Sequence, residues 1–272
     1  MTKIAPLTHR GIVELTGPDR ISFLNGLVSN DVGKAAPGRA VWAALLTPQG
    51  RYLLDFFVFS DGERLLLELA RAEIPAFLQK LRRFKLRSQL NVADVSENFS
   101  VHAVWQGAPP VSTLTAMDPR LPEAGYRSLD LPNHMSASAS LEDYAAHRIG
   151  LGLPDGPPDL EPEKTLLLEA GFEELNGIDW QKGCYMGQEL TARTKYRGLV
   201  KRRLLPVTLS QSGFEAGTAI HANGQEVGTM RSHVGTQALA MLQLSALNQP
   251  LFVADTPLTF HVPGWFKQPG LA

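Results

Sequence analysis

Hydrophobic and polar residues alternate along the first third of the chain in a pattern that predicts strands and one short helix. The alternation covers 10–15, and a turn at 16–19 is followed by apolar residues at helical spacing over 21–28, with Asp19 as the expected N-cap. Three further apolar runs, separated by short turns, predict antiparallel strands. These runs cover residues 39–46, 52–59 and 65–69.

The middle of the chain changes twice to helical periodicity. Apolar residues share one face of a helix expected over 72–81, with Pro75 in its first turn, and a second helix is expected over 141–149. Short strand-like runs lie between these helices, at 90–95, 100–105 and 127–129. The polar stretch 133–140 is expected to be a loop.

The last third of the chain changes character again. Residues 153–162 carry four prolines and three acids, which predicts an irregular, exposed crossing between two subdomains. Short alternating runs follow at 203–209, 218–221, 225–231, 238–244 and 257–262, and they predict a small β-barrel or sandwich. We therefore expect an α+β fold of antiparallel sheets with helices over 1–200, divided near 133–162, and a C-terminal β-barrel over 201–272.

The composition narrows the classes of function. The chain has 272 residues, of which 44% are hydrophobic, and this suits ordinary packed cores. Its 26 basic and 27 acidic side chains give a net charge of -1, so attraction to nucleic acid or to an anionic membrane has to be local. No signal or transit peptide and no membrane-length apolar run is visible, so we expect a cytoplasmic protein, or a mitochondrial matrix protein in a eukaryote, with no membrane partner.

The only cysteine, Cys184, lies in the most unusual local sequence, Lys182-Gly183-Cys184-Tyr185-Met186-Gly187-Gln188-Glu189. The two glycines permit a tight backbone on which a thiol, an amine, a phenol and a carboxylate converge, and the ammonium group of Lys182 favours a reactive thiolate. The alternative is a small buried hydrophobe, and no nearby His supports a papain-like nucleophile. One thiol cannot hold an iron–sulfur cluster alone. The seven His residues form no short-spaced His or Cys/His pair of the kind that binds zinc, so we expect no stable metal.

This motif is the signature of the YgfZ family, and the chain resembles that family on it and on the following 190–203. The resemblance extends over 10–58, through Gly17-x-Asp19-Arg20 and Thr47-Pro48-x-Gly50, and over 118–127. Relatives of the family include glycine-cleavage aminomethyltransferases and folate-dependent domains of sarcosine and dimethylglycine dehydrogenases. The resemblance therefore implies an aminomethyltransferase-like fold, tetrahydrofolate or a derivative as cofactor, and a role in iron–sulfur protein assembly.

The resemblance also implies site residues. Leu168-Glu169-Ala170-Gly171 resembles the place where the aminomethyltransferases put a carboxylate on the pterin ring, whose amino group and adjacent N–H are two parallel donors. The alternative for Glu169 is a solvated or capping acid. We expect Cys184 and Lys182 to take the catalytic role. The residues expected to contact folate are Glu169, Tyr185, Gln188, Glu189, Arg193, Arg197 and Asp55.

Asp55 marks a difference from the aminomethyltransferases. Those enzymes resemble this chain here but carry two consecutive acids, the first of them catalytic, where this chain has Leu54-Asp55. Leucine cannot position a proton, so we do not expect classical aminomethyl transfer. A structural, hydrogen-bonding role for Asp55 ranks above a catalytic one.

Cations gather in two basic clusters. The first basic cluster comprises Arg82, Arg83, Lys85 and Arg87, and the second comprises Arg193, Lys195, Arg197, Lys201, Arg202 and Arg203. In an extended strand, residues 193, 195 and 197 would project from one face beside the Cys184 loop, where the glutamate tail of a folate, a phosphate backbone or an acidic partner could lie. The aromatic ring of Tyr196 slightly favours a ligand surface over a merely solvated one.

Three functions stay open at this point. The first is a tetrahydrofolate-binding accessory protein that presents Cys184 and acts with iron–sulfur client or assembly proteins, a tRNA-thiolating enzyme being one client that the family resemblance suggests. The second is a folate-dependent aminomethyltransferase or one-carbon transferase. The third is an RNA-binding module that uses both basic clusters, and it ranks last because no RNA-binding motif is present.

Overall fold

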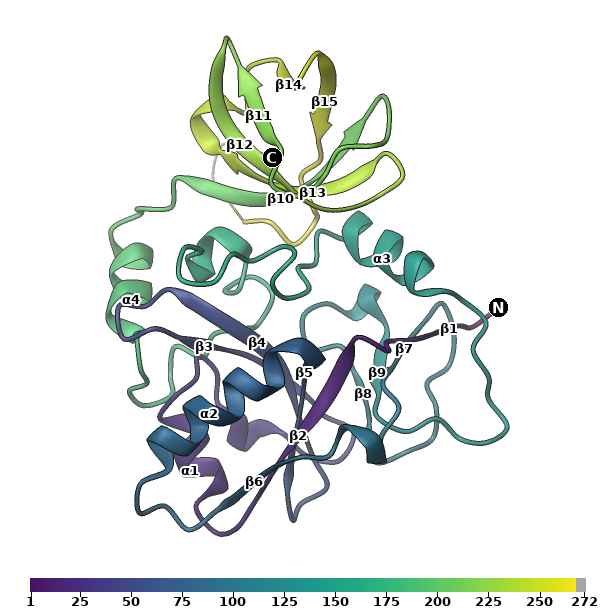
Figure 1. The fold of residues 1–272 in the computed structure, drawn as a ribbon, viewed down its shortest axis with the longest axis vertical. Coiled ribbons are helices and arrows are strands. Elements are labelled where there is room, and N and C mark those ends of the chain that lie inside the picture. The colour runs from purple at the N-terminus through teal and green to yellow at the C-terminus, as the bar shows by residue number, and fades with distance from the viewer. Residues whose placement is uncertain (268–272) are drawn as a thin grey trace.

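The body of the protein is built on two antiparallel sheets, with a β-barrel above them (Figure 1). The computed structural model describes residues 1–267. The five-stranded sheet has the order β3-β4-β5-β2-β6 and comprises β2 (Arg10–Thr16), β3 (Val41–Leu46), β4 (Tyr52–Ser60), β5 (Leu65–Ala70) and β6 (Asn91–Asp94). The four-stranded sheet has the order β1-β7-β9-β8 and comprises β1 (Lys3–Pro6), β7 (His102–Trp105), β8 (Thr115–Met117) and β9 (Tyr126–Ser128).

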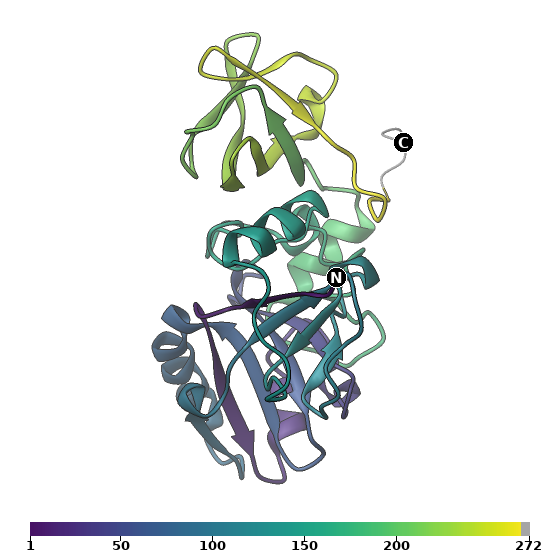
Figure 2. The same cartoon turned by 90° about the vertical axis from the view of Figure 1, so that its right-hand side faces the viewer.

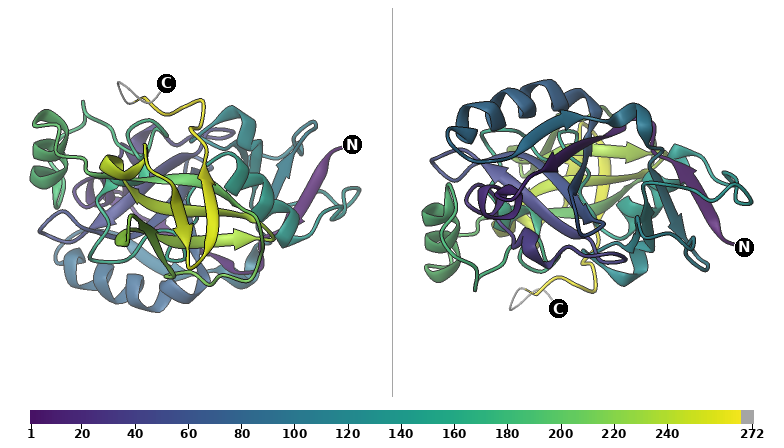
Figure 3. Two further views of the ribbon diagram at one scale, coloured as in Figure 1. Left: turned by 90° about the horizontal axis from the view of Figure 1, so that it is seen from above. Right: turned by 90° about the horizontal axis from the view of Figure 1, so that it is seen from below.

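The five-stranded sheet separates two hydrophobic cores. Every residue of β3 is buried, because alternate side chains enter opposite cores: Ala43 packs on the side of α2, and Trp42 packs on the other side. Helix α2 (Ile74–Lys85) covers the first side with Phe77 and Leu81, and α1 (Arg20–Asn25) adds Leu24 to the same core. Figure 3 shows α2 lying across the outside of this sheet.

Two more helices lie between the sheets and the barrel or at the side of the body. Helix α3 (Leu141–Gly150) begins with a capping box in which Ser140 and Asp143 exchange hydrogen bonds, and it packs against the barrel strands β12 and β13. Helix α4 (Gln188–Tyr196) directly follows the cysteine motif. Figures 1 and 3 place α4 and the N-terminus on opposite sides of the molecule.

The barrel is a closed ring of six strands in the order β10-β13-β12-β11-β14-β15, and Figure 2 shows it standing on the body. Its strands are β10 (Arg202–Leu209), β11 (Ala219–Ala222), β12 (Gln225–Val234), β13 (Gln237–Gln243), β14 (Leu251–Val253) and β15 (Thr256–Phe260). The chain then returns to the body, where the indole N–H of Trp265 donates to the carbonyl of Leu151 at 2.8 Å. A Cβ on Gly171, whose φ is 77°, would lie 2.8 Å from the Trp265 ring, so this contact requires glycine.

A buried network of charges joins the two sheets. The carboxylate of Glu68 lies 2.8 Å from the Nε of Arg10 and 2.5 Å from a terminal nitrogen of Arg127. Asp118 pairs with Arg120 at 2.7 Å and with Arg127 at 3.4 Å. All five side chains are almost fully buried, so each charge depends on its partners rather than on water.

The α+β fold with its C-terminal barrel is confirmed, and most elements lie where the sequence predicts them. Three short strands were not predicted, because three or four residues are too few to show alternation. They are β1, β8 and β14. Helix α1 ends at Asn25, earlier than expected. Asp19 occupies the N-cap position, as predicted, but its carboxylate accepts the N–H of Gln89 at 2.7 Å and makes no capping hydrogen bond.

The strand expected over 193–197 is wrong, because this segment belongs to α4 and its C-terminal cap. Arg193 pairs with Glu189 one turn earlier at 2.7 Å, and the hydroxyl of Thr194 donates to the carbonyl of Leu190 at 2.8 Å. Residues two positions apart do not share a face of a helix. Residues 193, 195 and 197 therefore form no row of cations.

The crossing 153–162 has no helix or strand, as expected, but it is partly buried rather than exposed. Asp159 is fully buried. Its carboxylate accepts from Arg148 at 2.7 Å and from the backbone N–H of Ser232 at 3.1 Å, and these bonds compensate for the loss of water. Leu160 enters the main core. The acids of this segment thus attach it to α3 and to the barrel.

Candidate functional site

The Cys184 loop is held to the body by the ammonium group of Lys182. Its Nζ donates to the carbonyl oxygens of Asn25, Val28 and Asn30 at 2.9, 2.7 and 2.8 Å. Burial lowers the pKa of Lys182 to about 8, whereas three carbonyl acceptors favour the charged form, since only the ammonium has three protons to donate. Lys182 is therefore a positioning residue, and Cys184 is left exposed at the surface.

Two glycines bring the cysteine motif against the turn at 47–50. Gly50 and Gly187 have φ values of 80° and 81°, and a Cβ on Gly50 would lie 2.6 Å from the carbonyl oxygen of Gly187. A Cβ on Gly187 would lie 2.6 Å from the carbonyl oxygen of Thr47. Two segments that the sequence singles out separately are thus in direct contact, and both glycines are required by close packing as well as by backbone conformation.

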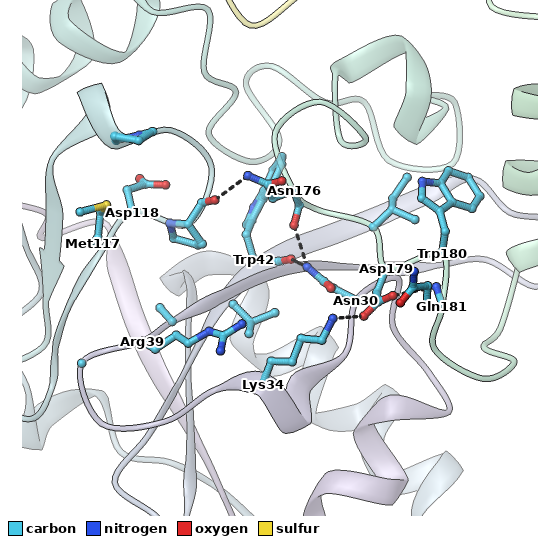
Figure 4. A pocket seen from close by; sticks show the side chains of 16 residues that line it. Asn30, Lys34, Arg39, Trp42, Met117, Asp118, Asn176, Asp179, Trp180 and Gln181 are labelled. Atoms are coloured by element: carbon cyan, nitrogen blue, oxygen red, sulfur yellow. Dashed lines mark hydrogen bonds and ion pairs between the residues drawn. The ribbon is translucent and has the colours of Figure 1, made fainter.

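A cavity of about 650 Å³ lies at the start of the motif (Figure 4). Asp179 stands at its edge, where its carboxylate pairs with Lys34 at 2.5 Å and accepts the backbone N–H groups of Gln181 and Lys182 at 2.8 and 3.1 Å. These bonds lower the pKa of Asp179 against its partial burial. Asp179 therefore fixes the turn that leads into the Cys184 loop, and Trp180 continues the cavity wall.

A second cavity, of about 680 Å³, lies between the body and the barrel, and we call it the junction cavity. Its lining residues are Arg51, Leu166, Glu169, Leu199, Lys201, Arg202, Gln243, Leu244 and Ser245. Glu169 sits on a short 3-10 turn and is buried, and its two carboxylate oxygens accept from the Nε and a terminal nitrogen of Arg202 at 3.2 and 2.9 Å. Glu169 thus lies in a cavity wall, as a ligand-binding acid would.

Asp55 is buried and faces the core that contains Trp42. Its carboxylate accepts from the indole N–H of Trp42 at 2.8 Å and from the hydroxyl of Tyr52 at 2.7 Å. Burial is the largest effect on the Asp55 carboxyl and raises its pKa, although Arg10 and these hydrogen bonds act in the opposite direction. Leu54 points to the opposite core, beneath α2. Asp55 lines neither of the two cavities described above.

The other expected folate contacts are dispersed. The phenol of Tyr185 is buried, which raises its pKa to about 12, and its ring lies 5.2 Å from the Nζ of Lys182. Gln188 and Glu189 form the first turn of α4, and Glu189 is exposed and paired with Arg193. Arg197 is exposed at the end of α4. None of these residues lines the junction cavity.

The two basic clusters differ in how far their charges are neutralised. In the second basic cluster, Arg193, Lys195, Arg202 and Arg203 pair with Glu189, Glu173, Glu169 and Glu174. Arg197 and Lys201 make no ion pair within residues 1–267, and neither does any member of the first basic cluster.

Sequence reasoning missed several residues around these cavities. The sequence places Arg202 in a basic cluster but does not indicate that it pairs with Glu169, and no sequence pattern points to Arg51. Asp179 had a usable signal, because an Asp shortly before a glycine-containing turn commonly accepts backbone N–H groups two and three residues on. No local signal in the sequence indicates the pair Glu169–Arg202, since 33 positions separate the two residues.

The described part of the chain, residues 1–267, contains no group of three or more His, Cys, Asp and Glu side chains placed to hold a metal ion. Within the same residues, every helix is too short or too polar to cross a membrane.

Comparisons with known proteins agree with this architecture. Residues 201–268 match the family model of the CAF17 C-terminal beta-barrel domain. The fold is similar to the crystal structure of glycine cleavage system aminomethyltransferase T from Bartonella henselae, with a TM-score of 0.74 at 14% identity over 98% of this chain and 87% of that one. At this identity the likeness concerns the fold.

Sequence relatives are iron–sulfur cluster assembly factors. The mitochondrial IBA57 homolog of Mycosarcoma maydis is 36% identical over 244 residues, which are 80% of this chain and 60% of that protein. The mitochondrial IBA57 proteins of Mus musculus and Homo sapiens are 32% and 31% identical over 96% of this chain. The chain spans 60% of the length of the Mycosarcoma maydis protein, and 84% of the mouse and human proteins.

The similarity to the mouse and human proteins extends along nearly the whole chain, and the barrel match covers its last part. It confirms the family that the cysteine motif indicates. The chain therefore belongs to the IBA57 family of iron–sulfur cluster assembly factors, on a fold shared with glycine-cleavage aminomethyltransferase.

Proposed function

We propose that this protein binds tetrahydrofolate or a derivative in the junction cavity and supports iron–sulfur protein assembly through the exposed thiol of Cys184. The observation that carries the folate half is the buried carboxylate of Glu169 in the wall of a cavity of about 680 Å³. That volume lies within the range of small-molecule sites, roughly 300–1,000 Å³.

The chemistry of the junction cavity suits a folate. Each oxygen of Glu169 accepts one bond from Arg202, and each keeps a further lone pair for the amino group and ring N–H of a pterin. Leu166, Leu199 and Leu244 supply apolar surface for a flat ring. Arg51, Lys201 and Arg202 oppose the single negative charge of Glu169, so the cavity favours a ligand with two carboxylates, as a folate with one glutamate has.

Isothermal titration with tetrahydrofolate tests this half. We expect the Glu169→Gln variant to bind about tenfold to a hundredfold more weakly, because a hydrogen bond to a charged group is replaced by a neutral one. Glu226→Gln, at an exposed position of the barrel, makes the same change of charge and should bind normally. Absence of binding by the unaltered protein, or equal binding by both variants, would remove the folate proposal.

The iron–sulfur half rests on the family and on the accessible thiol. Because Lys182 holds the loop from one side, Cys184 has a defined position and still faces solvent. One thiol cannot complete a cluster site, so a partner protein or a small thiol has to supply the remaining ligands. A tRNA-thiolating iron–sulfur enzyme is one candidate client.

Complementation tests this second half independently of folate. We expect Cys184→Ala to fold and to bind tetrahydrofolate like the unaltered protein, yet to fail to restore iron–sulfur enzyme activity in a strain that lacks the protein. Met186→Leu, a change of similar size two residues along the same loop, should restore it. Full activity with Cys184→Ala would assign the thiol a structural role only.

Aminomethyl transfer is less well supported by the position of Asp55 than the accessory role is by Glu169 and Cys184. Both oxygens of Asp55 are occupied by Trp42 and Tyr52, and Asp55 lines neither of the two site cavities. An acid that does not reach a cavity cannot exchange a proton with a substrate there. Tetrahydrofolate-dependent turnover with the lipoylated carrier of the glycine cleavage system would contradict this conclusion.

A further inference from the structure

The first basic cluster surrounds the C-terminal end of α2, beside α1 and far from the barrel (Figures 1 and 2). Arg82, Arg83 and Arg87 are exposed, and none of the four cations pairs with an acid within residues 1–267. Cations near a helix C-terminus interact favourably with the helix dipole, which accounts for part of this cluster. It does not account for Arg87, which lies beyond the helix.

Leu86, at the centre of this cluster, is explained neither by packing nor by backbone preference. Its side chain is 87% exposed, and its φ is 42°, in the left-handed region that favours glycine. Helices commonly place glycine at such a terminal position, because glycine has no Cβ to strain. Here a leucine stands in a strained conformation with almost all of its apolar surface in water, and the neighbouring Phe84 is 39% exposed. Strain and exposure together point to an external contact.

The arrangement of the charges favours a diffuse anionic surface over a single binding partner. Successive residues of a helix turn by about 100°, so Arg82, Arg83 and Lys85 point over a wide arc around the helix end instead of forming one row. A protein partner would need acids placed to match this arc and a pocket for Leu86. A bilayer accepts an apolar side chain without a preformed pocket, and its anionic headgroups can meet cations at any spacing.

We propose that this end of α2 is a reversible docking site for an anionic lipid bilayer, with Leu86 entering the interface and the first basic cluster meeting the lipid phosphates. The sequence by itself predicts no membrane partner, because no spanning segment is visible and the net charge is only -1, but a local patch can still provide the attraction. Of the two basic clusters, the first is the one in which no cation pairs with an acid within residues 1–267, whereas four cations of the second are paired. Docking in this way keeps the barrel, at the opposite end of the molecule, away from the bilayer (Figure 1). The proposal does not depend on folate binding or on Cys184.

Co-sedimentation of the full chain with vesicles tests the proposal. We expect binding to vesicles of phosphatidylcholine mixed with phosphatidylglycerol, little binding to pure phosphatidylcholine, and a loss of binding as salt is added. Each cation near an anionic surface changes affinity about fivefold, so Arg82→Gln with Arg83→Gln should weaken binding about 25-fold. The matched control is Arg197→Gln with Lys201→Gln, which removes two unpaired charges of the second basic cluster and should leave binding unchanged.

Leu86→Gly separates the docking role from a structural one. Removing the side chain relieves the strained backbone, so the variant should melt no earlier than the unaltered protein while its vesicle affinity falls roughly tenfold. Leu199→Ser, at another exposed leucine, is the control for the apolar change, and it should bind the vesicles like the unaltered protein. The proposal is overturned if anionic vesicles do not bind, if the control pair weakens binding as much as the α2 pair, or if Leu86→Gly binds normally. RNA or an acidic protein that binds this patch while vesicles do not would likewise overturn it.

Discussion

The Nζ of Lys182 lies 2.7 Å from the carbonyl oxygen of Val28, across 154 positions of sequence. Two further carbonyl oxygens of the same segment, those of Asn25 and Asn30, accept from the same ammonium group. The loop that presents Cys184 is thereby tied to the chain that follows α1. The lysine of the motif thus helps to fix the position of the loop that carries the thiol.

Lys182→Met should loosen this loop. The change leaves three carbonyl oxygens without their donor, so we expect the free energy of unfolding to fall by about 2 kcal/mol and Cys184 to react faster with a maleimide. Urea unfolding and alkylation kinetics measure the two effects. Lys201→Met, at an exposed lysine without an ion pair, should change neither. Unaltered stability and alkylation in Lys182→Met would show that the three contacts do not hold the loop.

Arg127→Met should destabilise the body strongly. The arginine bridges Glu68 and Asp118, both buried, and its removal leaves their charges less compensated at a cost of about 3–5 kcal/mol. Urea unfolding measures the loss, with Arg197→Met as the exposed control. Adding Glu68→Gln to Arg127→Met should recover part of the stability, because one of the uncompensated charges is then gone. No recovery would mean that lost packing, not charge, explains the effect.

Stability should fall as the pH is lowered from about 7.5 to about 5.5. Burial is the main cause that lowers the pKa values of His102 and His147 below the ordinary 6.5. The unfolded chain therefore takes up protons in this range before the folded chain does, and unfolding becomes easier. Asp118 and Asp155 do not contribute here, because their pKa values are lowered from 3.8 and their stabilisation is lost only at more acid pH.

The measurement is urea unfolding at both pH values. Replacing His102 and His147 by Gln should reduce the pH dependence, whereas replacing the exposed His134 should not. An unchanged pH dependence in the double variant would place the sensitive groups elsewhere.

Local patterns in the sequence determined most of the elements, because strands and helices of six or more residues show their period directly. Apolar periodicity places α2 and α3, and the short alternating runs beyond Lys201 place five of the six barrel strands. The one substantial error, a strand over 193–197, arose because cations at every second position imitate the alternation of a strand. The segment is helical, and Arg193 pairs with Glu189 four residues earlier.

The sequence also determined the family, since the cysteine motif is a contiguous string that needs no structure to be seen. Only the tertiary structure decided how its residues are placed: Lys182 holds the loop, Tyr185 is buried, and Cys184 is exposed. It likewise decided that Glu169 meets Arg202 in a cavity wall, and that the second basic cluster is largely paired while the first is not. The physical reason is that ion pairs, burial and cavities join residues far apart in the chain, whereas a linear pattern records only neighbours.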